Sequence, residues 1–66
     1  MRILLNGEAC ECESGTSVAD LLVRAGLADR KVAVEINRVI VPRSQHTARK
    51  LADDDRVEIV QAIGGG

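Results

Sequence analysis

The chain has 66 residues, carries nine basic against ten acidic side chains, and contains no Phe, Tyr or Trp. A chain of this length has room for one domain, residues 1–66, because about 60 residues bury only about 60% of the surface that the unfolded chain exposes. The formal net charge of -1 provides no field that would attract a polyanion, so we expect no nucleic-acid partner. The longest apolar run, Val39 to Pro42, is far shorter than the roughly 20 residues of a membrane span, so we expect no membrane partner.

The first residues and the two cysteines favour a cytoplasmic location. The start, Met1-Arg2-Ile3-Leu4-Leu5, is similar to that of a signal peptide, but Asn6-Gly7-Glu8 ends the apolar run before a signal-peptide core of about 7 to 15 residues can form. Cys10 and Cys12 lie two apart in an expected strand, where their Cα atoms would be about 6.6 Å apart, near the limit for a disulfide. We therefore expect two free thiols and a cytoplasmic protein.

The first predicted element is a β-hairpin. Asn6-Gly7 separates two strand-like runs, Arg2 to Leu5 and Glu8 to Glu13, and Asn-Gly at this place is a strong signal for a tight turn with positive φ. In the second run Cys10 and Cys12 alternate with small or charged residues. Both cysteines are therefore expected to face the core.

A helix is predicted to begin at about Val18. Ser17 followed by Asp20 is close to a capping box, and Gly26 is well placed to end the helix in the left-handed conformation. Apolar residues at i, i+3, i+4 and i+7 form one stripe, which we expect to be buried: Val18, Leu21, Leu22 and Ala25.

Three further strands are predicted after the helix: residues 31–36, residues 39–41 ended by Pro42, and residues 56–61. The segment between Arg43 and Asp55 is polar apart from Leu51 and is expected to be a loop. The order strand, strand, helix, strand, strand, strand predicts an α+β roll in which one helix packs on one sheet.

Side chains offer little chemistry. His46 stands alone in the polar loop, and a solvated position is expected for it. Cys10 and Cys12 could ligate a soft metal or carry a persulfide, but packing in the core is the favoured interpretation. Asp53-Asp54-Asp55 could attract a hard cation, although a solvated bend is favoured. We expect no metal, no bound cofactor and no catalytic side chain.

The C-terminal sequence differs from the rest. Gly64-Gly65-Gly66 would occur by chance at a chosen position about once in three thousand sequences. Glycines without Cβ atoms fit a slot too narrow for any side chain. At about 3.3 to 3.6 Å per residue, Ala62 to Gly66 can carry a carboxylate some 17 Å from the folded body. We therefore expect the Gly66 carboxylate to be the reactive group, with Gly65 and Gly64 giving access to it.

Three segments together resemble the ThiS family of thiamine-pathway sulfur carriers, relatives of ubiquitin and of the small subunit of molybdopterin synthase. They are Asn37 to Arg43, Leu51 to Val60 and the glycine terminus, with weaker support from Ser17-Val18 and Leu21-Leu22. The resemblance implies a ubiquitin-like β-grasp fold with a mixed sheet of about five strands. In this fold the last strand lies parallel to the first at the centre of the sheet.

The resemblance also implies a function. A ThiF-type adenylyltransferase, similar to the ubiquitin-activating enzymes, would use ATP to adenylate the Gly66 carboxylate. Sulfur from a cysteine-derived donor such as a cysteine desulfurase would convert it to a thiocarboxylate, which delivers sulfur to a ThiG-type thiazole synthase. The chain would then be a co-substrate and not an enzyme. Ile63, Ala62 and Arg43 are expected to lie at the partner interface.

Two differences from the family and three alternatives remain. The turn that commonly reads Asp-Gly-Asp is Asp53-Asp54-Asp55 here, which places Asp where φ is expected to be positive. The aromatic residues that many relatives carry after Pro42 or before the tail are absent.

Three alternative functions remain open. The same terminus would serve a sulfur carrier of the molybdopterin, cysteine or tRNA thiolation pathways, or a protein modifier that is joined to its targets. A β-grasp module that binds RNA would not need the glycine terminus.

Overall fold

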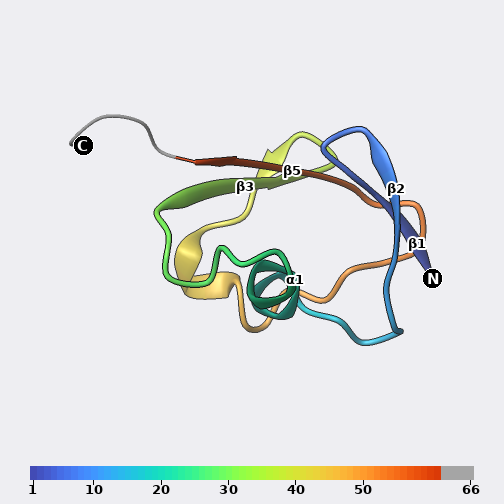
Figure 1. Ribbon diagram of the computed structural model, residues 1–66, viewed down its shortest axis with the longest axis horizontal. Coiled ribbons are helices and arrows are strands. Elements are labelled where there is room, and N and C mark those ends of the chain that lie inside the picture. The colour runs from blue at the N-terminus through green and yellow to red at the C-terminus, as the bar shows by residue number, and fades with distance from the viewer. Residues whose placement is uncertain (62–66) are drawn as a thin grey trace.

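The computed structural model describes residues 1–61. It contains five strands, one α-helix and one short 3₁₀ helix, η1 (Figure 1). In chain order these are β1 (Arg2–Leu5), β2 (Glu8–Glu11), α1 (Val18–Arg24), β3 (Val32–Ile36), β4 (Val39–Ile40), η1 (Arg43–Gln45) and β5 (Arg56–Gln61).

The strands form one mixed sheet in the order β2-β1-β5-β3-β4. The last strand, β5, lies at the centre, parallel to β1 and antiparallel to β3. The helix α1 and η1 lie on one side of the sheet (Figure 1). This arrangement confirms the predicted α+β class and the β-grasp topology implied by the resemblance.

The predicted hairpin is present between β1 and β2. Asn6 and Gly7 both have positive φ, 49° and 86°, as the tight turn of a two-residue hairpin requires. The second strand ends at Glu11, two residues earlier than predicted. Cys12 and Glu13 therefore belong to the connection that leads to α1.

Local signals define both ends of α1. The Ser17 Oγ accepts from the Asp20 backbone N–H at 3.0 Å, and the Asp20 carboxylate accepts from the Ser17 N–H at 3.1 Å, which completes the predicted capping box. Gly26, with φ of 76°, donates to the Val23 carbonyl oxygen, and the next N–H, from Leu27, donates to the Leu22 carbonyl oxygen. These two bonds are a Schellman motif.

One residue of the predicted helical stripe is misplaced. Val18, Leu21 and Leu22 are buried, but Ala25 is exposed. The helix ends at Arg24, so Ala25 is its C-cap and no longer follows the helical period. Leu27, after the Gly26 turn, packs against the core instead.

The core is aliphatic apart from one thiol. It consists of Ile3, Cys12, Val18, Leu21, Leu22, Val34, Ile36, Val41, Leu51, Val57 and Ile59. Strand β4 is one residue shorter than predicted, because only Val39 and Ile40 form strand pairs with β3. Both side chains are exposed. Val41 is buried, and its backbone N–H still donates to the Val34 carbonyl oxygen of β3 at 2.8 Å.

The prediction of a solvated loop from Arg43 to Asp55 is wrong for His46. This side chain is only 8% exposed, and its Nε2 lies 3.1 Å from the Val41 carbonyl oxygen, to which it donates. The segment crosses the start of α1, where the Ala19 N–H donates to the His46 carbonyl oxygen at 2.9 Å. Because first-turn N–H groups have no partner within a helix, the loop completes the N-terminus of α1.

The prediction of a solvated bend at Asp53 to Asp55 is wrong for Asp55. Its carboxylate is buried and accepts from the Ala52 backbone N–H at 2.7 Å and from Asn37 Nδ2 at 3.0 Å. Asp53 is exposed and accepts from the Arg2 backbone N–H at 2.9 Å. Asp54 has φ of 68°, which confirms the expected positive φ at the middle position.

Candidate functional site

The candidate site is the segment that follows β5, and the described residues show how its base is held. On one side of β5 the antiparallel ladder with β3 runs as far as the pair Val32 and Gln61. On the other side the backbone pairing with β1 reaches Val57. Beyond Val57, the Asn6 side chain replaces β1 as the hydrogen-bond partner of β5. Its Oδ1 accepts from the Ile59 N–H at 2.8 Å, and its Nδ2 donates to the Ile59 carbonyl oxygen at 3.3 Å.

This clamp holds the end of β5 on both sides. The central strand is bonded on both sides through Ile59 and on one side as far as Gln61, the last described residue. The predicted site residues Ala62, Ile63, Gly64, Gly65 and Gly66 lie outside the described residues 1–61. Three assignments therefore stay predictions: Gly66 as the sulfur-carrying residue, Gly65 and Gly64 as the residues that give access, and Ala62 and Ile63 as interface residues.

Arg43, the remaining predicted interface residue, is exposed and opens η1. It lines a cleft between α1 and the segment that contains η1, together with His46. A smaller hollow, also lined by Arg43, extends to Arg30 and Val32. The structure thus brings Arg43 near the N-terminal end of β3, whose first residue pairs with Gln61 at the base of the tail.

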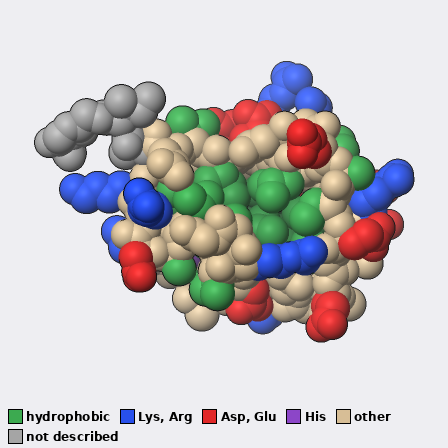
Figure 2. All heavy atoms as spheres, viewed as in Figure 1, with side chains coloured by type: hydrophobic (Ala, Val, Ile, Leu, Met, Phe, Trp, Pro, Cys, Tyr) green, Lys and Arg blue, Asp and Glu red, His purple; other side chains and the backbone are tan. Residues whose placement is uncertain are grey.

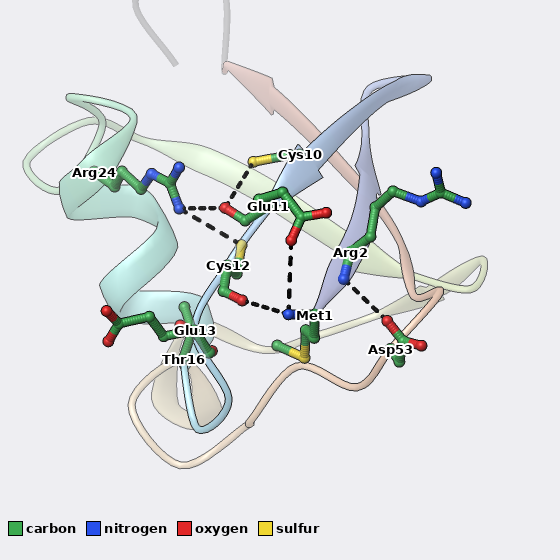
Figure 3. A network of polar contacts seen from close by, with 9 residues as sticks. All are labelled: Met1, Arg2, Cys10, Glu11, Cys12, Glu13, Thr16, Arg24 and Asp53. Atoms are coloured by element: carbon green, nitrogen blue, oxygen red, sulfur yellow. Dashed lines mark hydrogen bonds and ion pairs between the residues drawn. The ribbon is translucent and has the colours of Figure 1, made fainter.

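Cys10 in β2 and Cys12 in the connection after it both lie on the side that packs toward the core. Cys10 is opposite the buried Ile3 but only half-buried, because β2 is an edge strand, whereas Cys12 is buried. The Arg24 guanidinium lies beside them, donating to the Glu11 carbonyl oxygen at 2.7 Å with Nη1 3.8 Å from the Cys12 Sγ (Figure 3). Both side chains face the core side, as predicted.

Burial makes Cys12 a poor nucleophile. Desolvation is the largest cause that raises the pKa of the Cys12 thiol; the neighbouring Cys10 raises it further, while Arg24 opposes both. A thiol with a raised pKa stays protonated near neutral pH, and only the thiolate attacks or binds metals well. The surroundings of Cys12 therefore favour a packing role over sulfur chemistry.

The described residues offer no cation site. Within residues 1–61, no three His, Cys, Asp or Glu side chains lie close enough together to hold a metal ion. The carboxylate of Asp55 is already occupied by protein donors and lies 3.8 Å from Arg49 Nη2. Over the same residues, no helix has the length and apolar character needed to cross a membrane.

Sequence reasoning missed two residues that shape this region. Asn6 was predicted only as a turn residue, and nothing in its local sequence indicates that its amide reaches Ile59, 53 positions away. The sequence gives no signal for Arg30, because only the fold places it at the same hollow as Arg43. Asn37 lies in the segment Asn37 to Arg43, on which the resemblance rests, and this is a partial signal that the residue matters. In the structure the Asn37 side-chain amide donates to Asp55 and accepts from the Arg56 N–H.

Comparison with known proteins agrees with this architecture. The ThiS family model matches residues 3–66. The sulfur carrier protein ThiS of Escherichia coli is 36% identical over the full length of both chains. The crystal structure of a thiamine biosynthesis protein (ThiS) from Geobacter metallireducens superposes with a TM-score of 0.85 at 29% identity and covers all of both chains.

Two relatives are much longer proteins. A thiazole synthase from Magnetococcus marinus is 47% identical over all 66 residues of this chain, which span 20% of that protein. A thiazole synthase from Paramagnetospirillum magneticum is 42% identical with the same coverage. The chain therefore spans about a fifth of the length of these relatives, and all of the length of the Escherichia coli protein. From the family match over nearly its whole length, the full-length relative and the shared fold, the chain belongs to the ThiS family.

Proposed function

We propose that this protein is a sulfur carrier for the thiazole ring of thiamine, and that the Gly66 carboxylate carries the sulfur. The observation that supports this most is the central strand β5, which is held by β3 as far as Gln61 and by Asn6 at Ile59. The names of the relatives, sulfur carrier and thiazole synthase, indicate the pathway. The chain would act as a co-substrate in the cytoplasm and not as an enzyme.

The chemistry requires activation of the terminus. A carboxylate is a poor electrophile, so one of its oxygens attacks the α-phosphate of ATP on a ThiF-type enzyme, which releases pyrophosphate and forms an acyl adenylate. The persulfide of a cysteine-derived donor such as a cysteine desulfurase then displaces AMP, which leaves with that oxygen, and forms an acyl disulfide. A second thiol attacks the donor's sulfur in this bond, becomes a disulfide with the donor, and releases the carrier's sulfur. The product is a thiocarboxylate, an anionic and soft nucleophile that thiazole synthase can consume.

The first experiment is intact-mass analysis of the protein isolated from its native host. We expect a fraction whose mass increase matches replacement of one oxygen by sulfur, located at Gly66 by fragmentation. Deletion of Gly66 should abolish this species and leave the fold intact. Thiazole formation by the truncated protein with purified partners would contradict the proposal.

A matched control separates the tail from the thiols. In the variant Cys10→Ala/Cys12→Ala the mass increase and sulfur delivery should persist, because Cys12 is buried with a raised pKa. Loss of sulfur delivery in a variant whose unfolding curve shows a folded state would instead assign the sulfur to a cysteine.

A further inference from the structure

The cleft between α1 and η1 is a surface that the proposed chemistry does not use. Its larger part, about 220 Å³, is bordered by Ala19, Leu22 and Val23 of α1 and by Arg43, His46 and Thr47 of the η1 segment, with Ala28 between them. An adjoining hollow of about 30 Å³ adds Arg30 and Val32. This is smaller than a typical small-molecule pocket of about 300 to 1,000 Å³, and its size suits side chains of another protein.

The lining combines an aliphatic surface with positive charge. Val23 is an exposed aliphatic side chain, 66% accessible, at the border, and Leu22 lies almost buried beside it. Arg30 and Arg43 are exposed, and within residues 1–61 neither guanidinium forms an ion pair or a side-chain hydrogen bond. No Asp or Glu of the described part of the chain lines the cleft, although Asp29 is next to Arg30 in the sequence.

The cleft also lies close to the base of the tail. Val32 lines it and pairs with Gln61, the last described residue, and paired residues of antiparallel strands have Cα atoms about 5 Å apart. In Figure 2, Lys and Arg side chains lie at the end of the molecule where β5 stops, with an Asp or Glu side chain below them, and others lie at the opposite end. A protein that takes the tail into its active site therefore comes within reach of the two arginines.

We infer that this cleft docks a segment of thiazole synthase that presents an aliphatic side chain next to an Asp or Glu. The aliphatic side chain would pack on Leu22 and Val23, and the carboxylate would pair with Arg43, with Arg30 adding positive charge. Opposite charges at the border of an interface mainly accelerate association and set its register. The inference rests on the proposed function, which makes thiazole synthase the receiving enzyme.

The test compares two charge reversals in the full chain, Arg43→Glu and Arg2→Glu. Arg2 is a matched control, because it is exposed and its backbone bonds to Asp53, in the loop before β5, at the opposite end of that strand from Gln61. Binding to purified thiazole synthase is measured by calorimetry, and association rates by stopped flow at low and high salt. We expect Arg43→Glu to weaken binding about tenfold, mainly through slower association, and Arg2→Glu to change it by less than about twofold.

The salt dependence gives a second readout. Raising the salt concentration should slow association of the wild type more than that of Arg43→Ala, because the variant lacks the screened attraction. Thermal melts of the variants should match the wild type, since the described structure gives the Arg43 side chain no partner to lose. Val23→Ser, which removes aliphatic surface without changing charge, should also weaken binding.

Other outcomes overturn the inference. Unchanged affinity for Arg43→Glu would show that thiazole synthase does not contact the cleft. Tighter binding would mean that the arginines hold a segment of this chain instead. Slower pyrophosphate release with the activating enzyme, at unchanged thiazole synthase affinity, would assign the cleft to that enzyme. The mass assay at Gly66 is independent of all these results, so failure of the docking model is distinguishable from failure of the proposed function.

Discussion

Asp55 shows how one buried carboxylate joins two distant parts of the chain. It accepts from Ala52 within its own loop and from Asn37 at the turn after β3, and it lies 3.8 Å from Arg49. Asn37 in turn accepts from the Arg56 N–H at 3.0 Å, at the start of β5. The loop, the β3–β4 turn and the central strand are therefore held by a single side-chain network.

Removal of this carboxylate should be costly. In Asp55→Ala the Ala52 N–H and the Asn37 amide lose a charged acceptor, and hydrogen bonds to charged groups contribute about 1.5 to 3 kcal/mol each. We expect the free energy of unfolding to fall by about 2 to 4 kcal/mol, measured by urea denaturation. Asp53→Ala, which removes one exposed acceptor, should cost clearly less, and equal losses would show that the network around Asp55 has no special role.

At the scale of elements, α1 depends on its surroundings. It has seven residues, whereas isolated helices shorter than about 12 to 15 residues are marginal in water. Its first turn is completed by the capping box of Ser17 and Asp20 and by the loop carbonyl of His46, and its last turn by the Gly26 motif. The helix forms because neighbouring residues cap both of its ends, the His46 carbonyl oxygen completes its first turn, and one of its faces packs in the core.

The capping box predicts an acid-sensitive contribution to stability. Backbone and side-chain hydrogen bonds with Ser17 hold the pKa of Asp20 below its ordinary value of 3.8. A carboxyl whose pKa is lower in the folded state binds fewer protons there than when unfolded, so it stabilises the fold above its ordinary pKa. This contribution is lost as the pH falls through the ordinary value and then through the lowered one.

The variant Asp20→Asn should reveal this effect. Wild-type and variant unfolding midpoints in urea are compared at about pH 6, above the ordinary pKa of the carboxyl group, and at about pH 3, below that ordinary value. The variant should be less stable than the wild type at the higher pH, and the difference should shrink at the lower pH. A constant difference between the two proteins at both pH values would contradict a titrating cap.

At the scale of the molecule, stability and chemistry are assigned to different parts of the chain. The buried hydrophobic residues of the described structure lie between Ile3 and Ile59, and the clamp on β5 uses Asn6, Val32 and Gln61. The glycines follow this assembly. Substitutions among them should therefore change transfer chemistry while the folded body stays as it is.

Gly65→Ala tests this division. The melting temperature should stay almost unchanged, whereas adenylation by the activating enzyme should fall on the order of a hundredfold, because a displacement of about 1 Å at a reacting centre has that effect. Gly64→Ala, one residue further from the carboxylate, is the matched control and should do less harm. The measurement is ATP-dependent pyrophosphate release at matched concentrations. Equal rates for both variants and wild type would show that the glycines do not provide access.

The sequence by itself determined the features that depend on near neighbours. The Asn6-Gly7 turn, the start of α1 after Ser17 and its end at Gly26 each involve residues within about five positions of one another, so their signals are complete in a short segment. The alternation of Val57 and Ile59 predicted a strand with one buried face for the same reason. The resemblance supplied the central position of β5, which local patterns do not contain.

Only the tertiary structure decided the contacts between residues far apart in the chain. His46 and Asp55 look like loop residues until the segment folds across the start of α1 and meets Asn37. Asn6 continues the sheet at Ile59, across 53 positions, and Arg30, in the loop before β3, and Arg43, in η1, line one hollow. These polar side chains are buried or brought together because the fold places hydrogen-bond donors next to acceptors from distant parts of the chain. The local hydrophobic period of a segment carries no information about such contacts.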